Sequence, residues 1–140
     1  MWAARRVHTL QTAAIYFALV FTAGFAFGVV RVSLLLPALG ERAAELIEAP
    51  FMLGAIVLSA RWLVRRRAAA PRELLAAGGL AASFVLVADV GVGVGLRGMT
   101  LADVFIDRDP IAGNVYYVLV VLFAVLPAWL GRAQRAAPPM

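Results

Sequence analysis

The sequence contains no cysteine and no lysine, and His8 is its only histidine. The absence of cysteine excludes disulfides, thiol catalysis and cysteine-ligated metals. A single histidine excludes multi-histidine metal and haem sites within one chain. Ser59, Ser83 and Thr22 are isolated hydroxyl groups without a histidine base, so no serine or threonine nucleophile is indicated. We therefore expect no metal site and no cofactor, and the sequence favours a non-enzymatic protein.

Charge is also scarce, because only 15% of the 140 residues are charged while 64% are hydrophobic, with a mean hydropathy of +0.90. Soluble domains are nearer half apolar, so the natural solvent of this chain is lipid. About four spans of roughly 20 residues fill the whole length. The expected fold is an all-α, integral membrane four-helix bundle that forms a single transmembrane domain over residues 1–140. The four helices are expected at about 9–36, 46–65, 72–96 and 110–130.

Prolines and glycines set the expected boundaries of the first two helices. Pro37 and Gly40 are expected to end the first helix. Residues 41–49 have helical propensity and carry three glutamates. Pro50 then either opens the second membrane helix or kinks it.

Capping signals mark the last connection and the fourth helix. Thr100 with Asp103 resembles a capping pair for a short amphipathic helix. Asp109 followed by Pro110 is a plausible cap and first-turn proline for the fourth helix. Gly131 is expected to end that helix.

Small residues lie on shared helical faces and indicate close packing between helices. The first helix carries a GxxxG motif, and the third helix is the richest in small residues. The residues expected to pack helix against helix are Gly24, Gly28, Gly78, Ala82 and Gly93. Such faces could also join copies of the chain into a homo-oligomer or attach it to a larger membrane complex.

Arginine placement predicts the topology. Nine arginines lie at the N-terminus, in the second loop and at the C-terminus, whereas the other two loops and their helix ends hold Arg31, Arg42, Arg97 and Arg108. Positive residues stay cytoplasmic, so both termini are expected to be cytoplasmic.

The arginine-only basic set, with abundant alanine and glycine, is typical of a GC-rich bacterial genome, so the expected location is the bacterial inner membrane. The basic surface indicates orientation rather than nucleic-acid binding, and Arg65, Arg66 and Arg67 are candidates for binding an anionic lipid.

Three ionisable residues are expected at matching depth near the outer face: Arg31, Glu48 and Asp89. Asp89 should lie roughly 24 Å along its helix from the cytoplasmic end. Charges at that depth are costly unless paired. Arg31 could be clasped by Glu48 and Asp89, either as a substrate or proton site open to the outside or as a structural clasp that fixes helix register. Arg61 is a further candidate, either for lipid phosphate or simply as a stem that carries its charge to the headgroups.

One stretch supports a resemblance. It runs from residue 31 to residue 61 and carries the pattern Arg31, Pro37, Gly40-Glu41, Glu48, Pro50, Met52 and Arg61. In this first half, the chain resembles a group of small, uncharacterised four-helix inner-membrane proteins of bacteria. The resemblance implies the four-helix membrane fold and no activity, cofactor or partner.

Three functions follow as expectations. The leading one is a structural or accessory membrane component, or an oligomer. The alternative is a small transporter or channel that uses the region of Arg31, Glu48 and Asp89. The third, an intramembrane lipid-modifying enzyme, lacks an identifiable nucleophile or metal ligand set.

Overall fold

The computed structural model describes residues 1–139, and this part of the chain is helical without strands. The helices are α1 (Trp2–Val30), η1 (Arg31–Leu35), α2 (Leu36–Leu39), α3 (Glu41–Arg66), α4 (Pro71–Val90), η2 (Gly91–Leu96), α5 (Leu101–Phe105) and α6 (Pro110–Ala136). The segments η1 and η2 are π-helical. Since η1 and α2 continue α1, and η2 continues α4, the described residues form four long rods. The predicted all-α class is confirmed.

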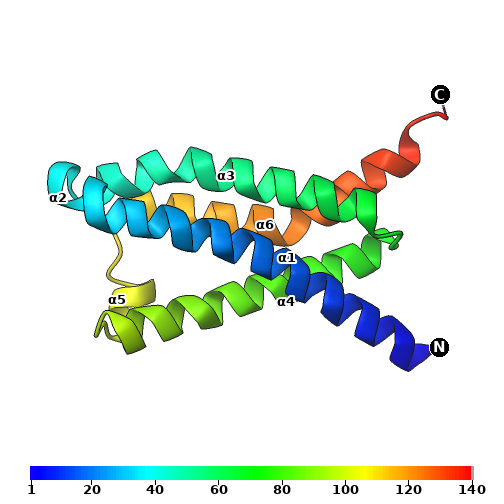
Figure 1. Cartoon of the computed structure of the whole chain (residues 1–140), viewed down its shortest axis with the longest axis horizontal. Coiled ribbons are helices and arrows are strands. Elements are labelled where there is room, and N and C mark those ends of the chain that lie inside the picture. Colours follow the sequence, from blue (N-terminus) through cyan, green and yellow to red (C-terminus); the bar gives the residue numbers. More distant parts are fainter. Residues whose placement is uncertain (140) are drawn as a thin grey trace.

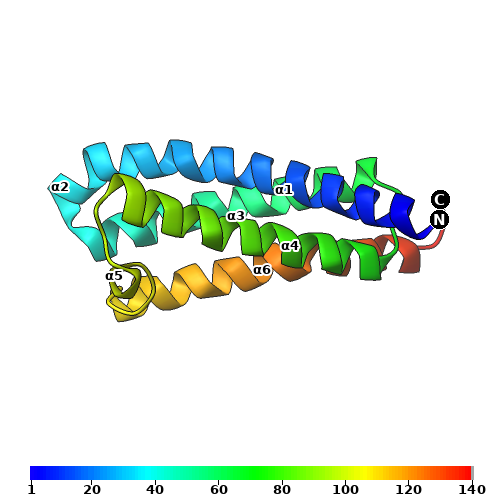
Figure 2. The same ribbon diagram turned by 90° about the horizontal axis from the view of Figure 1, so that it is seen from below.

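The four rods form a ring in which each packs against two others: α1 on α3, α3 on α6, α6 on α4, and α4 on α1. Figures 1 and 2 show that successive rods run in opposite directions. Both chain termini lie at one end of the bundle, called here the terminal end, and α2 and α5 lie at the other, called here the α5 end.

Several helix boundaries differ from the expected ones. The first helix begins at Trp2 rather than near residue 9. The second begins at Glu41, directly after Gly40, whose φ of 81° ends the preceding rod. Pro50 lies inside this helix and does not open it. Alanines on the N-terminal side of Pro50 favour helix, so the proline removes one hydrogen bond without ending the rod.

The fourth helix continues through Gly131 to Ala136, so the expected stop at Gly131 is wrong. A Cβ atom on Gly131 would lie 2.6 Å from Cδ1 of Leu74 on α4. This glycine therefore allows a close approach of α4 to α6. It packs helices together and does not terminate one.

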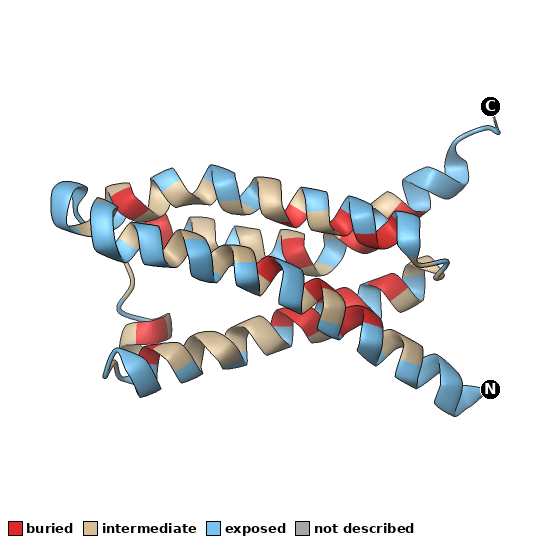
Figure 3. Cartoon of the chain, viewed as in Figure 1, coloured by how far each residue is buried: buried red, intermediate tan, exposed pale blue. Residues whose placement is uncertain are grey.

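The hydrophobic core lies in the half of the bundle nearer the terminal end, where Figure 3 shows most of the buried segments. The Tyr16 and Phe123 rings stack there with centroids 4.3 Å apart, and the Tyr16 hydroxyl donates a hydrogen bond of 2.8 Å to the carbonyl oxygen of Phe123. Pro127 has no N–H, so this carbonyl, four residues earlier in α6, lacks its usual helical donor. Tyr16 on α1 supplies the missing donor and so makes a proline in a buried helix tolerable.

The predicted packing residues have different surroundings. A Cβ atom on Gly78 would overlap the carbonyl oxygen of Ala124, so α4 and α6 touch backbone to backbone there. Ala82 is buried nearby. A Cβ atom added to Gly24 would lie 3.2 Å from Cε of Met52 on α3, whereas a Cβ atom added to Gly28 would meet no atom within 4 Å. The GxxxG pair therefore does not form one continuous helix contact within the chain.

Gly93 packs, but against a different kind of partner from the expected one. Its added Cβ would lie 2.7 Å from Cγ2 of Val104 in α5. This glycine thus allows the short helix of the last connection to close against η2, instead of joining two long helices.

All four rods are long and apolar enough to cross a membrane, with mean hydropathy between 1.6 and 2.1 over their most apolar windows. Large apolar side chains point outward along them, including Leu58, Val87 and Trp129, each about two-thirds exposed or more. Soluble proteins rarely expose so many contiguous apolar side chains. The fold therefore suggests a multi-pass membrane protein.

Candidate ligand cavity at the α5 end

The core does not extend to the α5 end. The last buried residue of α1 is Val20, and the last of α4 is Ala82. The two helices contact each other through Phe17 and Phe84, whose ring centroids are 5.8 Å apart, and then diverge toward the α5 end (Figures 1 and 3). A cavity of about 490 Å³ occupies the space beyond this contact. Its volume is in the range of sites that hold small molecules.

The cavity has apolar walls and a charged end. Its apolar lining comes from every long helix and includes Phe21, Phe25, Met52, Val85 and Leu119. Its ionisable lining consists of three arginines and five carboxylates, together with one tyrosine: Arg31, Arg97, Arg108, Glu41, Glu45, Glu48, Asp89, Asp103 and Tyr116. If these arginines and carboxylates are all ionised, the lining carries a net negative charge.

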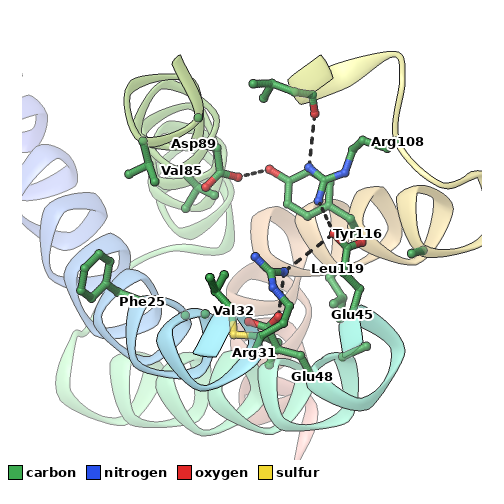
Figure 4. Close-up of a pocket in the computed structure, with 18 of the residues that line it drawn as sticks. Phe25, Arg31, Val32, Glu45, Glu48, Val85, Asp89, Arg108, Tyr116 and Leu119 are labelled. Atoms are coloured by element: carbon green, nitrogen blue, oxygen red, sulfur yellow. Dashed lines mark hydrogen bonds and ion pairs between the residues drawn. The ribbon is translucent and has the colours of Figure 1, made fainter. Parts of the chain in front are cut away.

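Arg31 is the first residue of η1 and reaches across to α3. Its Nη1 lies 2.8 Å from Oε2 of Glu48 and 3.8 Å from Oε1 of Glu45. The two glutamates are three residues apart and thus share a helical face. The guanidinium links the end of the first rod to the start of α3, as Figure 4 shows.

Arg108, in the connection before α6, completes this charged network. Its Nη2 lies 3.4 Å from Oε1 of Glu45, and its Nη1 donates to the carbonyl oxygen of Val104 at 3.3 Å. Its Cζ lies 4.2 Å from the centroid of the Tyr116 ring, in a cation–π arrangement. Its Nε is enclosed by the protein and has no acceptor within the described residues. Glu45 therefore bridges two arginines from distant parts of the sequence.

Asp89 belongs to the cavity, but its contact differs from the expected one. It accepts a hydrogen bond from the hydroxyl of Tyr116 on α6 (Figure 4). Within residues 1–139, no arginine nitrogen lies within 4.0 Å of its carboxylate. Arg31 and Glu48 are thus paired directly, whereas Asp89 shares their cavity without joining the pair.

Glu45, Arg108 and Tyr116 were not singled out by sequence reasoning. Glu45 is one of the three glutamates of residues 41–49, and Tyr116 lies among apolar residues of the fourth helix. Arg108 lies in a connection where no helical periodicity assigns a face. One available signal was the spacing of Glu45 from Glu48, which places both carboxylates beside Arg31.

Arg61 lies in a different part of the molecule. Together with Arg65 and Gln134 it lines a smaller depression of about 290 Å³ between the ends of α3 and α6, toward the terminal end. Arg66 instead lies over the ring of Trp62, with 5.9 Å between Cζ and the ring centroid. The structure therefore separates Arg61 from the Arg31 cluster and does not gather Arg65, Arg66 and Arg67 around one depression.

The rim of the α5 end is fixed by caps. The Thr100 and Asp103 pair caps α5 reciprocally, and Asp109 caps α6 through Ile111 and Ala112, so both predicted caps are confirmed. Hydrogen bonds from Thr100 hold the pKa of Asp103 below its usual value. Asp109 also lies 2.7 Å from Nη2 of Arg42, and the Arg42 hydrogen bond is the main cause of a lowered pKa at Asp109.

Comparisons of this protein with models of protein families, with curated proteins and with solved structures find no match. Among residues 1–139, no group of three or more histidine, aspartate or glutamate side chains is arranged to hold a metal ion. The chemistry of the cavity therefore follows from its own residues: apolar walls, a paired charged end, and one carboxylate held by a tyrosine.

Proposed function

We propose that this protein is a small multi-pass carrier of the bacterial inner membrane that binds a small amphipathic molecule in the cavity at the α5 end. The observation that carries the proposal is the combination of apolar walls and a charged end in one cavity of about 490 Å³. An apolar body fits beside Phe21, Phe25 and Val85, and a polar head fits beside Asp89 and Tyr116. Since α1 and α4 diverge there, such a ligand enters sideways from the lipid between these two helices.

The proposed orientation places the terminal end in the cytoplasm. Nine arginines lie toward that end, where Glu73 is the only acidic residue. Cytoplasmic loops of membrane proteins carry an excess of positive residues. Reporter tags on the two termini should both report the cytoplasm, and opposite locations would contradict the four-span arrangement.

Ligand binding is tested by photolabelling. The protein in lipid nanodiscs is exposed to a photoreactive long-chain alcohol, and labelled residues are mapped by mass spectrometry. Saturable labelling is expected at the cavity residues Phe21, Phe25 and Val85. Uniform labelling of all lipid-facing helices, without saturation, would contradict the proposal.

A matched pair of glycine variants sharpens this test. Gly28 lines the cavity and Gly79 does not, and an added Cβ on either meets no atom within 4 Å. Gly28→Trp should reduce the saturable labelling because the indole occupies cavity space, and Gly79→Trp should leave it unchanged. Equal effects of the two substitutions would show that the labelled site lies elsewhere.

A structural or accessory role is the second candidate. The open surroundings of Gly28 and Gly54, together with the exposed apolar side chains, favour it, because another helix could pack there. Purification from native membranes tests it. A stable partner or oligomer that disappears in Gly54→Leu, while photolabelling of the cavity stays absent, would favour this role over the carrier.

A further inference from the structure

The charge pairing inside the cavity indicates which kind of head group it accepts. Glu48 and Glu45 are each within ion-pair distance of an arginine, at 2.8 Å from Arg31 and 3.4 Å from Arg108. The other three cavity carboxylates differ in their surroundings: Glu41 is exposed, Asp103 accepts from the Thr100 N–H in the cap of α5, and Asp89 accepts from the neutral Tyr116 hydroxyl. A carboxylate in an apolar cavity that is held by a hydroxyl, with no arginine nitrogen within 4.0 Å among the described residues, is a site for a cation.

Arg31 and Arg108 are already engaged by carboxylates, and Arg97, the third arginine of the lining, is exposed at the end of η2, so none of them offers an equivalent enclosed site for an anion. Both Nη atoms of Arg108 contact acceptors, and its Nε is enclosed by protein atoms. Arg31 lies between Glu45 and Glu48. The lining as a whole holds five carboxylates against three arginines, which favours a positive ligand.

The walls near Asp89 suit a bulky apolar cation. Val85 precedes Asp89 by one helical turn, and Phe25 on α1 also lines the cavity (Figure 4). Aromatic rings stabilise organic cations through their negative faces. We propose that the ligand of the cavity is a lipophilic cation, an ammonium or similar centre on an apolar body, and that the Asp89 carboxylate held by Tyr116 is its counter-ion.

This inference rests on the proposed function, since it names the substrate class of the same cavity. The test uses tetraphenylphosphonium, and its anionic counterpart of similar shape, tetraphenylborate. Binding of each to protein in nanodiscs of zwitterionic phosphatidylcholine is measured by equilibrium dialysis, with empty nanodiscs subtracted. Saturable binding of the cation without saturable binding of the anion is expected. Saturable binding of the anion alone would overturn the inference.

Two isosteric variants separate the role of Asp89 from general charge effects. Asp89→Asn removes the proposed counter-ion, and Asp107→Asn removes an exposed carboxylate from the same end of the molecule that does not line the cavity. The cation should bind about tenfold more weakly to Asp89→Asn and equally well to Asp107→Asn. Unchanged binding in Asp89→Asn would overturn the inference.

Labelling by the neutral photoreactive alcohol distinguishes a failure of the cation inference from a failure of the proposed function. Saturable alcohol labelling retained in Asp89→Asn shows that the cavity is intact, so a loss of cation binding is then assigned to the charge. If the alcohol labels the wild type saturably but the cation does not bind, only the cation inference fails. If neither binds, the cavity does not hold amphipathic ligands and both proposals fail.

The same cationic chemistry occurs in free lipophilic amines and in amine-headed lipids. Adding phosphatidylethanolamine to the nanodiscs separates these sources. Competition with tetraphenylphosphonium would identify an amine-headed lipid as an occupant. Unchanged binding of the probe would identify a free lipophilic cation as the ligand.

Discussion

The two halves of the bundle are held together in different ways. Toward the terminal end, small residues let helices touch, and the polar contact is a neutral hydrogen bond from Tyr16 to Phe123. Toward the α5 end, the helices separate around a cavity, and ion pairs from Arg31 and Arg108 connect them. Close packing tolerates little change, whereas a charged network beside a cavity can rearrange. The first half is thus the more tightly packed, and the second has the freedom that the proposed entry of a ligand would require.

The largest expected effect lies in the packed half. Gly78→Leu should destabilise the protein by about 3 kcal/mol or more, because its side chain has to displace the backbone of α6 at Ala124. The neighbouring Gly79→Leu is the matched control, since an added Cβ there meets no atom within 4 Å. Unfolding by denaturing detergent measures both. Similar stabilities of the two variants would show that the α4–α6 contact is not close.

A smaller effect is expected from the hydrogen bond that compensates Pro127. Tyr16→Phe should cost about 2 kcal/mol, because it leaves the carbonyl of Phe123 without a donor in the core. Pro127→Ala restores a helical N–H to that carbonyl and should largely remove the cost of Tyr16→Phe in the double variant. Unfolding free energies of the two single variants and the double variant form the cycle. Additive costs would show that the hydroxyl and the proline are independent.

The charged half should respond less to the loss of one partner. Arg31→Ala should cost about 1–2 kcal/mol, since the adjoining cavity has room for water to solvate in part the glutamates that the substitution leaves unpaired. Glu48→Gln should partly rescue Arg31→Ala, whereas Asp89→Asn should rescue it less, because Asp89 contacts Tyr116 instead. Melting temperatures in detergent give the couplings. An equal rescue by both substitutions would mean that Arg31 interacts with Asp89 as strongly as it interacts with Glu48.

The smallest effect concerns the rim and depends on pH. The pKa of Asp109 is lowered in the folded protein, chiefly by the hydrogen bond from Arg42. Its stabilising contribution is therefore complete above the unfolded pKa of about 3.9 and is lost as the pH falls through the lower folded pKa. The difference in melting temperature between wild type and Asp109→Asn should shrink over this acidic window. A constant difference from neutral pH to well below pH 4 would contradict the linkage.

The sequence by itself determined the helical class, the number of long apolar helices and the caps at Thr100 and Asp109. These features depend on local properties: runs of apolar residues, and short polar side chains that accept hydrogen bonds from the next turn. The pairing of Arg31 with Glu48 was also accessible, since the polar residues flanking one short connection meet at the same end of two neighbouring helices.

Only the tertiary structure decided the remaining contacts. Packing between rods, and not local propensity, sets the helix ends at Glu41 and Ala136. The same holds for the close contact of Gly131 with Leu74. The contact between Tyr116 and Asp89 depends on how α6 is rotated about its axis relative to α4. The contact between Arg108 and Glu45 depends on the path of the connection before α6, which has no helical periodicity in its sequence. The cavity itself arises because α1 and α4 diverge beyond Phe17 and Phe84. A crossing angle between helices is a property of two packed surfaces together, so neither segment specifies it alone.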